Sequence, residues 1–456
     1  MIKSLIHSMI VCPDMDKVYP RITHGKGVYI YDENGKEYLD ASSGSAAVSN
    51  IGHGIKEMAE IMYEQASKIT VLPTHAFSSG VVESYLDELV AFAPDGFEKA
   101  WTVMSGTEAI ENAIKLAYQY QLLRGEGERY KVLGRWSSYH GNSIFTLDVG
   151  GMKLRRDTYS RWMNNFPHLS PAYQYRKPGH LSDLEYSSQL IAELEECITR
   201  EKPETIAAFI VEPVVAAALG AVPPPHATYL KQVKKVCEKH GILLISDEVL
   251  TGFGRLGANF GIDRWDVVPD IIAAGKGISG GYFPLSAVLA HQKVMQVFKD
   301  TKTPFLGGHT FACNPVGAAT GRFVLEYMKE HQIIQHAKQM GDYLNQLLQR
   351  LLELDIVGDV RGVGMLQGIE LVQDKITKQP FRKDLAISKR IGQACIDKGV
   401  VLYPGGGSVD GNAGDHIMIT PPLICEKHHI EKIVDVLEAS IREVMELSVN
   451  LNPTHQ

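Results

Sequence analysis

The stretch PDIIAAGKGISGGYFPLSAVLA, residues 269–290, holds two short apolar runs and, between them, a glycine-rich segment with a single lysine. The runs at 270–276 and 285–290 have the length and composition of buried β-strands. Lys276 ends the first run, and ligands of open α/β sheets bind beyond the carboxyl ends of strands. A lysine desolvated there has a lowered pKa and can form a Schiff base. The alternative, a lysine that reaches water or pairs with a carboxylate, stays open on this residue alone.

The segments before this stretch alternate between strand-like and helix-like patterns. Residues 207–214 and 242–249 are predicted to be buried strands, and residues 229–241 an amphipathic helix closed by glycine. Further upstream, residues 100–121 fit a strand, a tight Ser-Gly-Thr turn and a helix. Short apolar runs separated by helices indicate an α/β fold, with a mostly parallel sheet that helices cover on both faces.

The two ends of the chain have a different character. Residues 27–40 predict a β-hairpin in which Asn34 and Gly35 supply a type I′ turn. A long helical pattern follows Pro315, residues 360–371 alternate like a half-exposed antiparallel strand, and the chain closes with an amphipathic helix. We therefore expect a smaller α+β domain beside the large α/β domain.

Chain length bears on how these segments divide into domains. At about 150 residues per domain, a chain of 456 residues suggests two or three of them. We predict a large domain of residues 55–325 and a small domain that residues 1–54 and 326–456 build together.

Composition argues against several classes of function. The net charge of −7 and the lack of a Lys/Arg-rich block argue against nucleic acid as a partner. The start, residues 1–16, lacks the features of a cleaved signal, and Glu212 interrupts the longest apolar stretch, 206–222. We expect a cytoplasmic protein with no membrane span. The scattered cysteines, without a CxxC pair, predict reduced thiols and no metal site: Cys12, Cys197, Cys237, Cys313, Cys395 and Cys425.

Asp247 ends the strand that precedes the lysine strand. An acid at that strand end could bind a protonated ring nitrogen through a short, charge-assisted hydrogen bond. Glu248, the next residue, is expected on the opposite face of the strand. A buried acid paired with a basic neighbour is an equally open interpretation of Asp247.

The turn SGTEA, residues 105–109, opens a predicted helix. Free backbone N–H groups and the helix dipole make such a turn an anion site. Gly106 would let the backbone approach a phosphate, and Thr107 would add a hydroxyl donor. An ordinary cap by Ser105, with Glu108 in the first turn, is the alternative.

The segment SSYHGNS, residues 137–143, follows a strand-like run. It places Tyr139 and His140 before a glycine, where an aromatic ring could stack on a flat cofactor. A tyrosine packed in a βα loop is the alternative.

One motif suggests a different cofactor. GFGRLG, residues 252–257, matches the GxGxxG pattern of dinucleotide-binding folds. That pattern requires a helix at the glycines and an acid at the end of a later strand. Here the next residues lack a helical apolar period, and Asp270 begins a strand instead of ending one. The sequence therefore argues against a nicotinamide cofactor.

Taken together, these pieces resemble the class III pyridoxal-phosphate-dependent aminotransferases, which have the aspartate aminotransferase fold (fold type I). The resemblance runs from about Gly27 to about Leu437 and rests on nine motifs in the family's order and approximate spacing. It implies a transaminase whose large domain has a seven-stranded, mostly parallel sheet. The motifs are YLDASSGSAAVSNIGH (38–53), SGTEA, YHG, FIVEPV, LLISDEVLTGFGRLG, AAGKGISGG, GGHTFACNPVGAA (307–319), VRGVGMLQGIEL and ITPPLI.

The resemblance implies the cofactor pyridoxal 5'-phosphate and assigns two catalytic residues. Lys276 looks like the lysine that binds the cofactor and moves the proton, and Asp247 would keep the pyridine nitrogen protonated. Glu212 would orient groups near the 3-hydroxyl, while Tyr139 and Val249 would pack on the two faces of the ring. The full set of implied cofactor contacts is Ser105, Gly106, Thr107, Tyr139, His140, Glu212, Asp247, Val249, Lys276 and Thr310.

The phosphate contacts imply a homodimer. In the family pattern, Gly106 and Thr107 would bind the phosphate from one subunit and Thr310 from the other. The active site would then lie at the subunit interface.

The substrates depend on positions that differ between members of the family. Ornithine-type relatives carry an arginine where this chain has Met418, and amine–pyruvate relatives use one in the loop that corresponds to 403–416, which here has none. The resemblance places Ala46, Phe77 and Tyr139 in the substrate pocket. The small side chain of Ala46 and the glycine-rich loop suggest room for an amine or ω-amino acid donor, with pyruvate as the keto acid acceptor.

Two questions stay open at this point. Arg161 and Arg255 are candidates to bind the carboxylate of the keto acid, and Arg255 is expected to be structural. Relatives on the same scaffold racemise or decarboxylate amino acids, and the Lys276–Asp247 pair does not distinguish these reactions.

Overall fold

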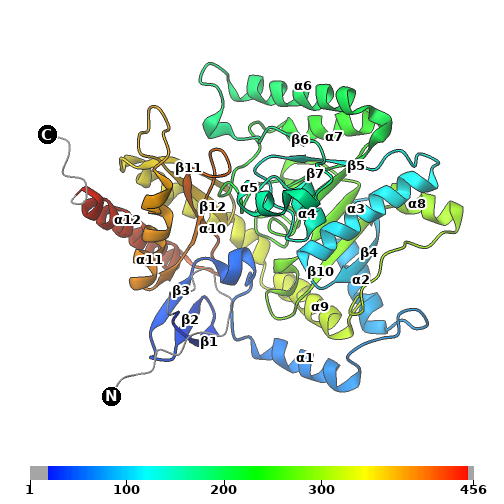
Figure 1. Cartoon of the computed structure of the whole chain (residues 1–456). Helices are drawn as coiled ribbons and strands as arrows, with labels where there is room; N and C mark the ends of the chain where they lie inside the picture. Colours follow the sequence, from blue (N-terminus) through cyan, green and yellow to red (C-terminus); the bar gives the residue numbers. More distant parts are fainter. Residues whose placement is uncertain (1–18, 450–456) are drawn as a thin grey trace.

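The computed structural model describes residues 19–449 of the chain (Figure 1). The predictions for residues 1–16 and for Cys12 lie outside the described residues. No helix within 19–449 combines the length and the apolar character that crossing a membrane requires. The described cysteines are free thiols, and most of them are buried: Cys197, Cys237, Cys313, Cys395 and Cys425.

A seven-stranded sheet forms the centre of the molecule. Strand β10 runs antiparallel to both of its neighbours, β4 and β9, and the other strand pairs of this sheet in residues 19–449 are parallel, so the predicted mostly parallel sheet is confirmed. In spatial order the strands are β4 (Phe97–Val103), β10 (Ser286–His291), β9 (Ile271–Ala274), β8 (Leu243–Glu248), β7 (Ile206–Val211), β5 (Lys131–Arg135) and β6 (His168–Leu169).

Helices cover both faces of this sheet (Figure 1). Along β7, Ala208 and Ile210 pack with α3 (Gly106–Leu123) and α8 (Gln292–Thr301) on one face. Phe209 points to the other face, where it packs in a cluster with side chains of α6 (Asp183–Glu201) and α7 (Tyr229–Lys239). Because alternate residues of a strand point to opposite faces, burial on both sides explains the unbroken apolar runs of the sequence.

The remaining helices of this part flank the sheet and its loops. Helices α1 and α2 both pack against α9. Short segments α4 and α5 follow the end of β5 along the chain. Their bounds are α1 (Lys56–Lys68), α2 (Gly80–Phe92), α4 (Ile144–Val149), α5 (Lys153–Arg156) and α9 (Pro315–Glu330).

Two smaller sheets lie beside the large one. An antiparallel sheet, packed with helices α10, α11 and α12, has the strand order β11, β12, β15, β14. In the other, the parallel pair β3–β13 joins segments from the two ends of the chain. The bounds are β1 (Ile22–Lys26), β2 (Tyr29–Asp32), β3 (Glu37–Asp40), α10 (Ile333–Leu348), β11 (Val357–Val363), β12 (Leu366–Leu371), α11 (Ile387–Asp397), β13 (Val400–Val401), β14 (Tyr403–Gly406), β15 (Asp415–Ile419) and α12 (Lys427–Val449).

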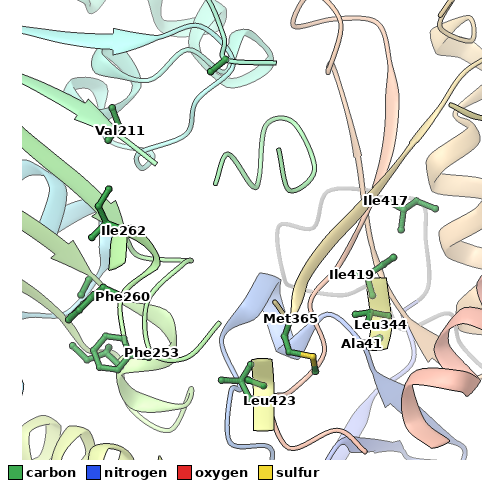
Figure 2. Close-up of a cluster of buried hydrophobic side chains, with 14 of the residues drawn as sticks. Ala41, Val211, Phe253, Phe260, Ile262, Leu344, Met365, Ile417, Ile419 and Leu423 are labelled. Atoms are coloured by element: carbon green, nitrogen blue, oxygen red, sulfur yellow. The ribbon is translucent and has the colours of Figure 1, made fainter. Parts of the chain in front are cut away.

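One apolar core runs between the large sheet and the antiparallel sheet (Figure 2). It contains side chains from the ends and loops of the large sheet and side chains from β15 and α10. The predicted domain limits, 55–325 against 1–54 with 326–456, stay a prediction. Labelled members of the core in Figure 2 are Ala41, Val211, Phe253, Phe260, Ile262, Leu344, Met365, Ile417, Ile419 and Leu423.

Two predictions for the last third of the chain were wrong in detail. Residues 360–371 form part of a hairpin, not one strand, because the chain turns at Gly364 with φ +56°. Strand β12 is buried along its whole length, so it is not half-exposed. The long helical pattern after Pro315 is two helices, which a left-handed Gln332 (φ 49°) separates.

The predicted hairpin at 27–40 is present, but its turn is not type I′. That turn needs a positive φ at both central residues. Only Gly35 has one (φ 79°), while Asn34 does not. The Asp32 carboxylate accepts hydrogen bonds from the backbone N–H groups of Asn34 and Lys36, both at 2.9 Å, and this side-chain turn sets the loop instead.

Candidate active site

The carboxyl ends of β4, β5, β7, β8 and β9 surround a cavity of about 180 Å³. Each strand end contributes the residues that follow it directly or after a short turn. This is the position at which open α/β sheets bind ligands. The cavity is lined by Gly106, Thr107, Tyr139, His140, Gly141, Glu212, Ala217, Asp247, Val249, Leu250, Thr251 and Lys276.

Asp247 reaches the cavity because of its place in β8. Leu243 and Ile245 of this strand pack on the face that α3 covers, and Asp247 continues their alternation. Its carboxylate lies 2.7 Å from His140 Nδ1 and accepts a hydrogen bond from Val249 N–H at 3.1 Å. Glu248 takes the opposite face, as predicted, and accepts from the backbone N–H groups of loop residues 261 and 262 at 2.7 and 2.8 Å.

His140 holds the Asp247 carboxylate in place through the contact with its Nδ1. The imidazole is buried, and an ionised carboxylate only accepts hydrogen bonds, so Nδ1 carries the proton. The second ring nitrogen, Nε2, is buried without a hydrogen-bond partner among the described residues. The pair therefore fixes the Asp247 carboxylate at the cavity wall as a strong acceptor.

Lys276 stands two residues after β9 in a left-handed conformation, with φ 48°. The glycines on each side are required by space. A Cβ at Gly275 would lie 2.9 Å from Ser286 Oγ, and one at Gly277 would lie 2.1 Å from Asn50 Nδ2. Burial lowers the pKa of Lys276 to about 8, although Asp247 and Glu212 act in the opposite direction. Its amine is thus prepared for nucleophilic attack near neutral pH.

Glu212 follows β7 and is held by two backbone groups. It accepts hydrogen bonds from Tyr139 N–H at 2.9 Å and from Ala216 N–H at 3.2 Å. Burial raises its pKa to about 7, with a further rise from the nearby Asp247 charge, while His140 lowers it. A carboxyl group with this pKa can accept or donate a proton inside the cavity.

The N-terminus of α3 has features of both structures considered for the SGTEA turn, an ordinary helix cap and an anion site. Ser105 caps the helix, accepting a hydrogen bond from Glu108 N–H at 3.2 Å, and the Glu108 carboxylate accepts one from Met104 N–H at 2.9 Å. Gly106 and Thr107 nevertheless line the cavity. A Cβ at Gly106 would lie 2.7 Å from Val249 Cγ1, so only glycine fits here without displacing its neighbour.

Four predicted site residues do not line this cavity. Thr310 is exposed on the segment between α8 and α9, and Phe77 is 66 % exposed before α2. Ala46 is buried in an apolar cluster that includes Leu250, a residue of the cavity wall. Ser105 stays at the helix cap beside the cavity.

The sequence interpretation missed part of the cavity lining. Leu250 and Thr251 directly follow Val249, so their place in the chain was a usable signal. Gly141 belongs to the YHG motif and has φ 136°, which favours glycine. Ala217 lies in the loop after β7 and offered no signal.

The two candidate arginines do not line the cavity. Arg255 is fully buried and donates to the carbonyls of Met365 and Pro421, at 3.0 and 2.5 Å, and to Asn50 Oδ1 at 2.5 Å. It therefore joins loop segments that are distant in sequence, which agrees with the expected structural role. Arg161 is exposed in the 3₁₀ turn at Asp157–Trp162.

The GFGRLG segment does not have the geometry of a dinucleotide site. No helix opens at its glycines, and the chain passes through turns until the 3₁₀ segment Gly261–Trp265. Asp270 precedes β9 and pairs with Lys234 at 2.9 Å. This geometry agrees with the sequence argument against a nicotinamide cofactor.

Comparisons with known proteins agree with this architecture. The family model for class-III aminotransferases matches residues 11–441. The uncharacterized aminotransferase YodT of Bacillus subtilis is 33 % identical over 438 residues, which cover 96 % of this chain and 98 % of YodT.

Solved structures of omega-transaminases have the same fold. A thermostable (S)-enantioselective omega-transaminase from Thermomicrobium roseum superimposes with a TM-score of 0.88 at 34 % identity, over 94 % of this chain and 93 % of that one. The omega-transaminase from Pseudomonas jessenii, solved in complex with PMP, gives a TM-score of 0.88 at 28 % identity, with 94 % and 93 % covered. The motifs, the strand-end cavity and these matches agree: the chain belongs to the class-III aminotransferase family.

Proposed function

We propose that this aminotransferase binds pyridoxal 5'-phosphate and moves an amino group from an amine or ω-amino acid to a keto acid, with pyruvate as the acceptor. The observation that carries the proposal is the arrangement of Lys276 and Asp247. A lysine with a lowered pKa and a buried carboxylate line the same cavity at neighbouring strand ends. The N-terminus of α3 lies at the same cavity.

The residues present fit this cofactor. The carboxylate of Asp247, fixed by His140, suits a protonated pyridine nitrogen, because the charged hydrogen bond is strong where water is excluded. When bound, the cofactor supplies an electron sink for the electrons of the broken C–H bond. Lys276 would bind the cofactor covalently through Nζ and then, as a free amine, accept and return the substrate proton.

The other wall residues would orient the group. The first turn of α3, at Gly106 and Thr107, would bind the phosphate, since backbone N–H groups and the helix dipole favour an anion there. Tyr139 and Val249 would enclose the ring between them. Glu212 would hold a proton near the 3-hydroxyl, and its raised pKa suits that role.

The pH dependence of cofactor binding tests the state of Lys276. Burial lowers the pKa of this amine to about 8, so below pH 8 most of it is charged and unreactive. The rate of pyridoxal-phosphate uptake by the apoprotein is expected to rise about tenfold per pH unit below that value and to level off above it. Stopped-flow absorbance measures the rate. A rate that continues to rise to about pH 10, as for an ordinary lysine, would contradict the lowered pKa.

The variant Gly106→Ala tests the phosphate turn. Its Cβ would lie 2.7 Å from Val249 Cγ1, so the turn or the valine must move. Overpacking of this kind costs roughly 1–3 kcal/mol, which predicts a cofactor dissociation constant about tenfold higher. Fluorescence titration with pyridoxal phosphate measures it. The matched control is Gly80→Ala at the start of α2, where a Cβ meets open space; equal affinities of the two variants would argue against this phosphate site.

We also propose a cytoplasmic homodimer. Leu306 and Phe311, in the segment between α8 and α9, are 77 % and 51 % exposed, and Phe77 is 66 % exposed; large exposed apolar side chains favour a protein interface. Thr310 belongs to the same segment as Leu306 and Phe311 and would reach the site of a second copy. Sedimentation of the purified protein tests the dimer.

The donor class is tested by a panel of amines. The holoenzyme would be mixed with pyruvate and either ω-amines and ω-amino acids or ornithine-type donors, and alanine formation would be followed. Faster turnover of the ω-amines supports the proposal, and faster turnover of ornithine-type donors contradicts it. Release of carbon dioxide, or deuterium exchange at the substrate carbon without a keto product, would instead identify a decarboxylase or a racemase.

A further inference from the structure

Arg155, in the short helix α5, lies next to the wall of the active-site cavity. Its guanidinium carbon is 5.3 Å from the centre of the Tyr139 ring, and Tyr139 lines the cavity together with Lys276. The side chain of Arg155 is exposed, and no carboxylate within residues 19–449 forms an ion pair with it. A cation without a carboxylate partner thus lies beside the ring of Tyr139, a residue of the cavity wall.

The basic neighbours of Arg155 have other contacts. Arg156 is buried and donates to the backbone carbonyls of Leu147 and Asp148, at 3.0 and 2.5 Å. Lys153 lies over the ring of Trp136, with its Nζ 5.4 Å from the ring centre. Of the three cations in α5, Arg155 is the one that is exposed and whose ring contact is with a residue of the cavity wall.

The glycine-rich loop 403–416 packs directly against α5. A Cβ at Gly407 would lie 2.9 Å from Leu154 Cδ1, and a Cβ at Gly411 would lie 2.6 Å from the Cβ of Lys153. This loop contains no arginine. Tyr403 at its start and Arg155 both act on the hydroxyl of Tyr139: burial mainly raises the pKa of Tyr139, Arg155 lowers it and Tyr403 raises it. Helix α5 thus lies between the Tyr139 ring, which Arg155 contacts, and the loop at Gly407 and Gly411.

We infer that Arg155 binds the carboxylate of the keto acid acceptor and so determines the preference for carboxylate-bearing substrates. The inference rests on the proposed transaminase function. A guanidinium binds a carboxylate through two parallel hydrogen bonds, and its stacking on Tyr139 would hold it in place. The lack of an internal carboxylate partner leaves both of these bonds to the substrate. The exposed Arg161 has no comparable contact with the cavity wall.

The variant Arg155→Gln tests this inference with two acceptors that differ in the carboxylate. With 1-phenylethylamine as donor, kcat/KM for pyruvate is expected to fall about 100-fold, through a higher KM, because a charge-assisted contact is lost. The value for propanal, which has no carboxylate, is expected to stay within about twofold of the wild type. Arg155→Lys keeps the charge but not the paired geometry. Its kcat/KM for pyruvate is expected to lie between those of the wild type and Arg155→Gln.

Arg161→Gln is the matched control, since it removes an exposed arginine six residues along the chain. This variant should leave kcat/KM unchanged for both pyruvate and propanal. Equal losses with pyruvate and propanal in Arg155→Gln would mean that Arg155 only supports Tyr139, and an unchanged KM for pyruvate would place the carboxylate elsewhere; either result overturns the inference. A wild-type enzyme that transfers an amino group to neither acceptor from any amine or ω-amino acid of the donor panel would overturn the proposed function itself.

Discussion

Replacing Lys276 with alanine is expected to reduce transamination by at least about 10⁴-fold, because both the covalent attachment of the cofactor and the proton transfer depend on this amine. The cavity contains no second lysine that could substitute for it. The visible absorption of lysine-bound pyridoxal phosphate should also be lost, although the cofactor can still bind through its phosphate and ring contacts. Steady-state rates with pyruvate and an absorption spectrum measure the two effects.

A nearby exposed lysine provides the control. Lys293, at the start of α8, is exposed, pairs with the buried Asp270 at 3.2 Å and does not line the cavity. Lys293→Ala should retain the absorption band and the activity. An active Lys276→Ala enzyme with an unchanged spectrum would remove Lys276 from the mechanism.

Replacing Asp247 with asparagine is expected to lower kcat by about 10²–10³-fold, the range seen when one preorganised electrostatic contact is removed from an active site. Asparagine preserves the shape of the side chain but not the charge that would keep the pyridine nitrogen protonated. The contact with His140 Nδ1, 2.7 Å in the native protein, also weakens when the carboxylate is lost. The rate of the half-reaction with an amine donor, followed by absorbance, measures the loss.

The variant Glu248→Gln separates the effect of charge from that of burial. Glu248 is the next residue, fully buried, but on the opposite face of β8, where burial raises the pKa to about 7. A neutral amide there should leave the half-reaction within about tenfold of the wild type. Equal losses in Asp247→Asn and Glu248→Gln would indicate a general effect of disturbing the strand end and would argue against a specific contact of Asp247.

The sequence predicted the sheet and the position of Lys276 and Asp247 at its carboxyl edge because both depend on local patterns. Short apolar runs separated by amphipathic helices specify a parallel sheet, and its strands place their carboxyl ends together. Lys276 and Asp247 both follow from that rule. Glu248 was placed on the other face by strand alternation alone, and the structure agrees.

The predictions that were wrong depended on tertiary contacts and single backbone conformations, which the pattern of apolar residues along the sequence does not show. The apolar period of residues 315–351 continues across Gln332, where a single left-handed residue ends one helix and starts the next. Strand β12 reads as alternating, yet it is buried along its whole length. The carboxylate of Asp32 sets the first hairpin, so the Asn34-Gly35 pair did not decide the turn.

Two groups of proposed site residues could not be located from the sequence of a single chain: Thr310 with Phe77, and Arg155. Thr310 and Phe77 are exposed and do not line the cavity, so a role for either in the site would need a second subunit. Arg155 escaped notice because only folding places α5 beside Tyr139, 16 residues earlier in the sequence. The two family positions hold no arginine, and the sequence suggested Arg161 and Arg255 instead; the arginine proposed here belongs to α5.

The central claim is that Lys276 forms the covalent bond to pyridoxal phosphate. The most direct measurement is borohydride reduction of the purified protein after incubation with pyridoxal phosphate, followed by proteolysis and mass spectrometry of every lysine-containing peptide. The account predicts a phosphopyridoxyl group on Lys276 and on no other lysine at stoichiometric cofactor. A modified lysine elsewhere, or no modified peptide at all, would contradict it.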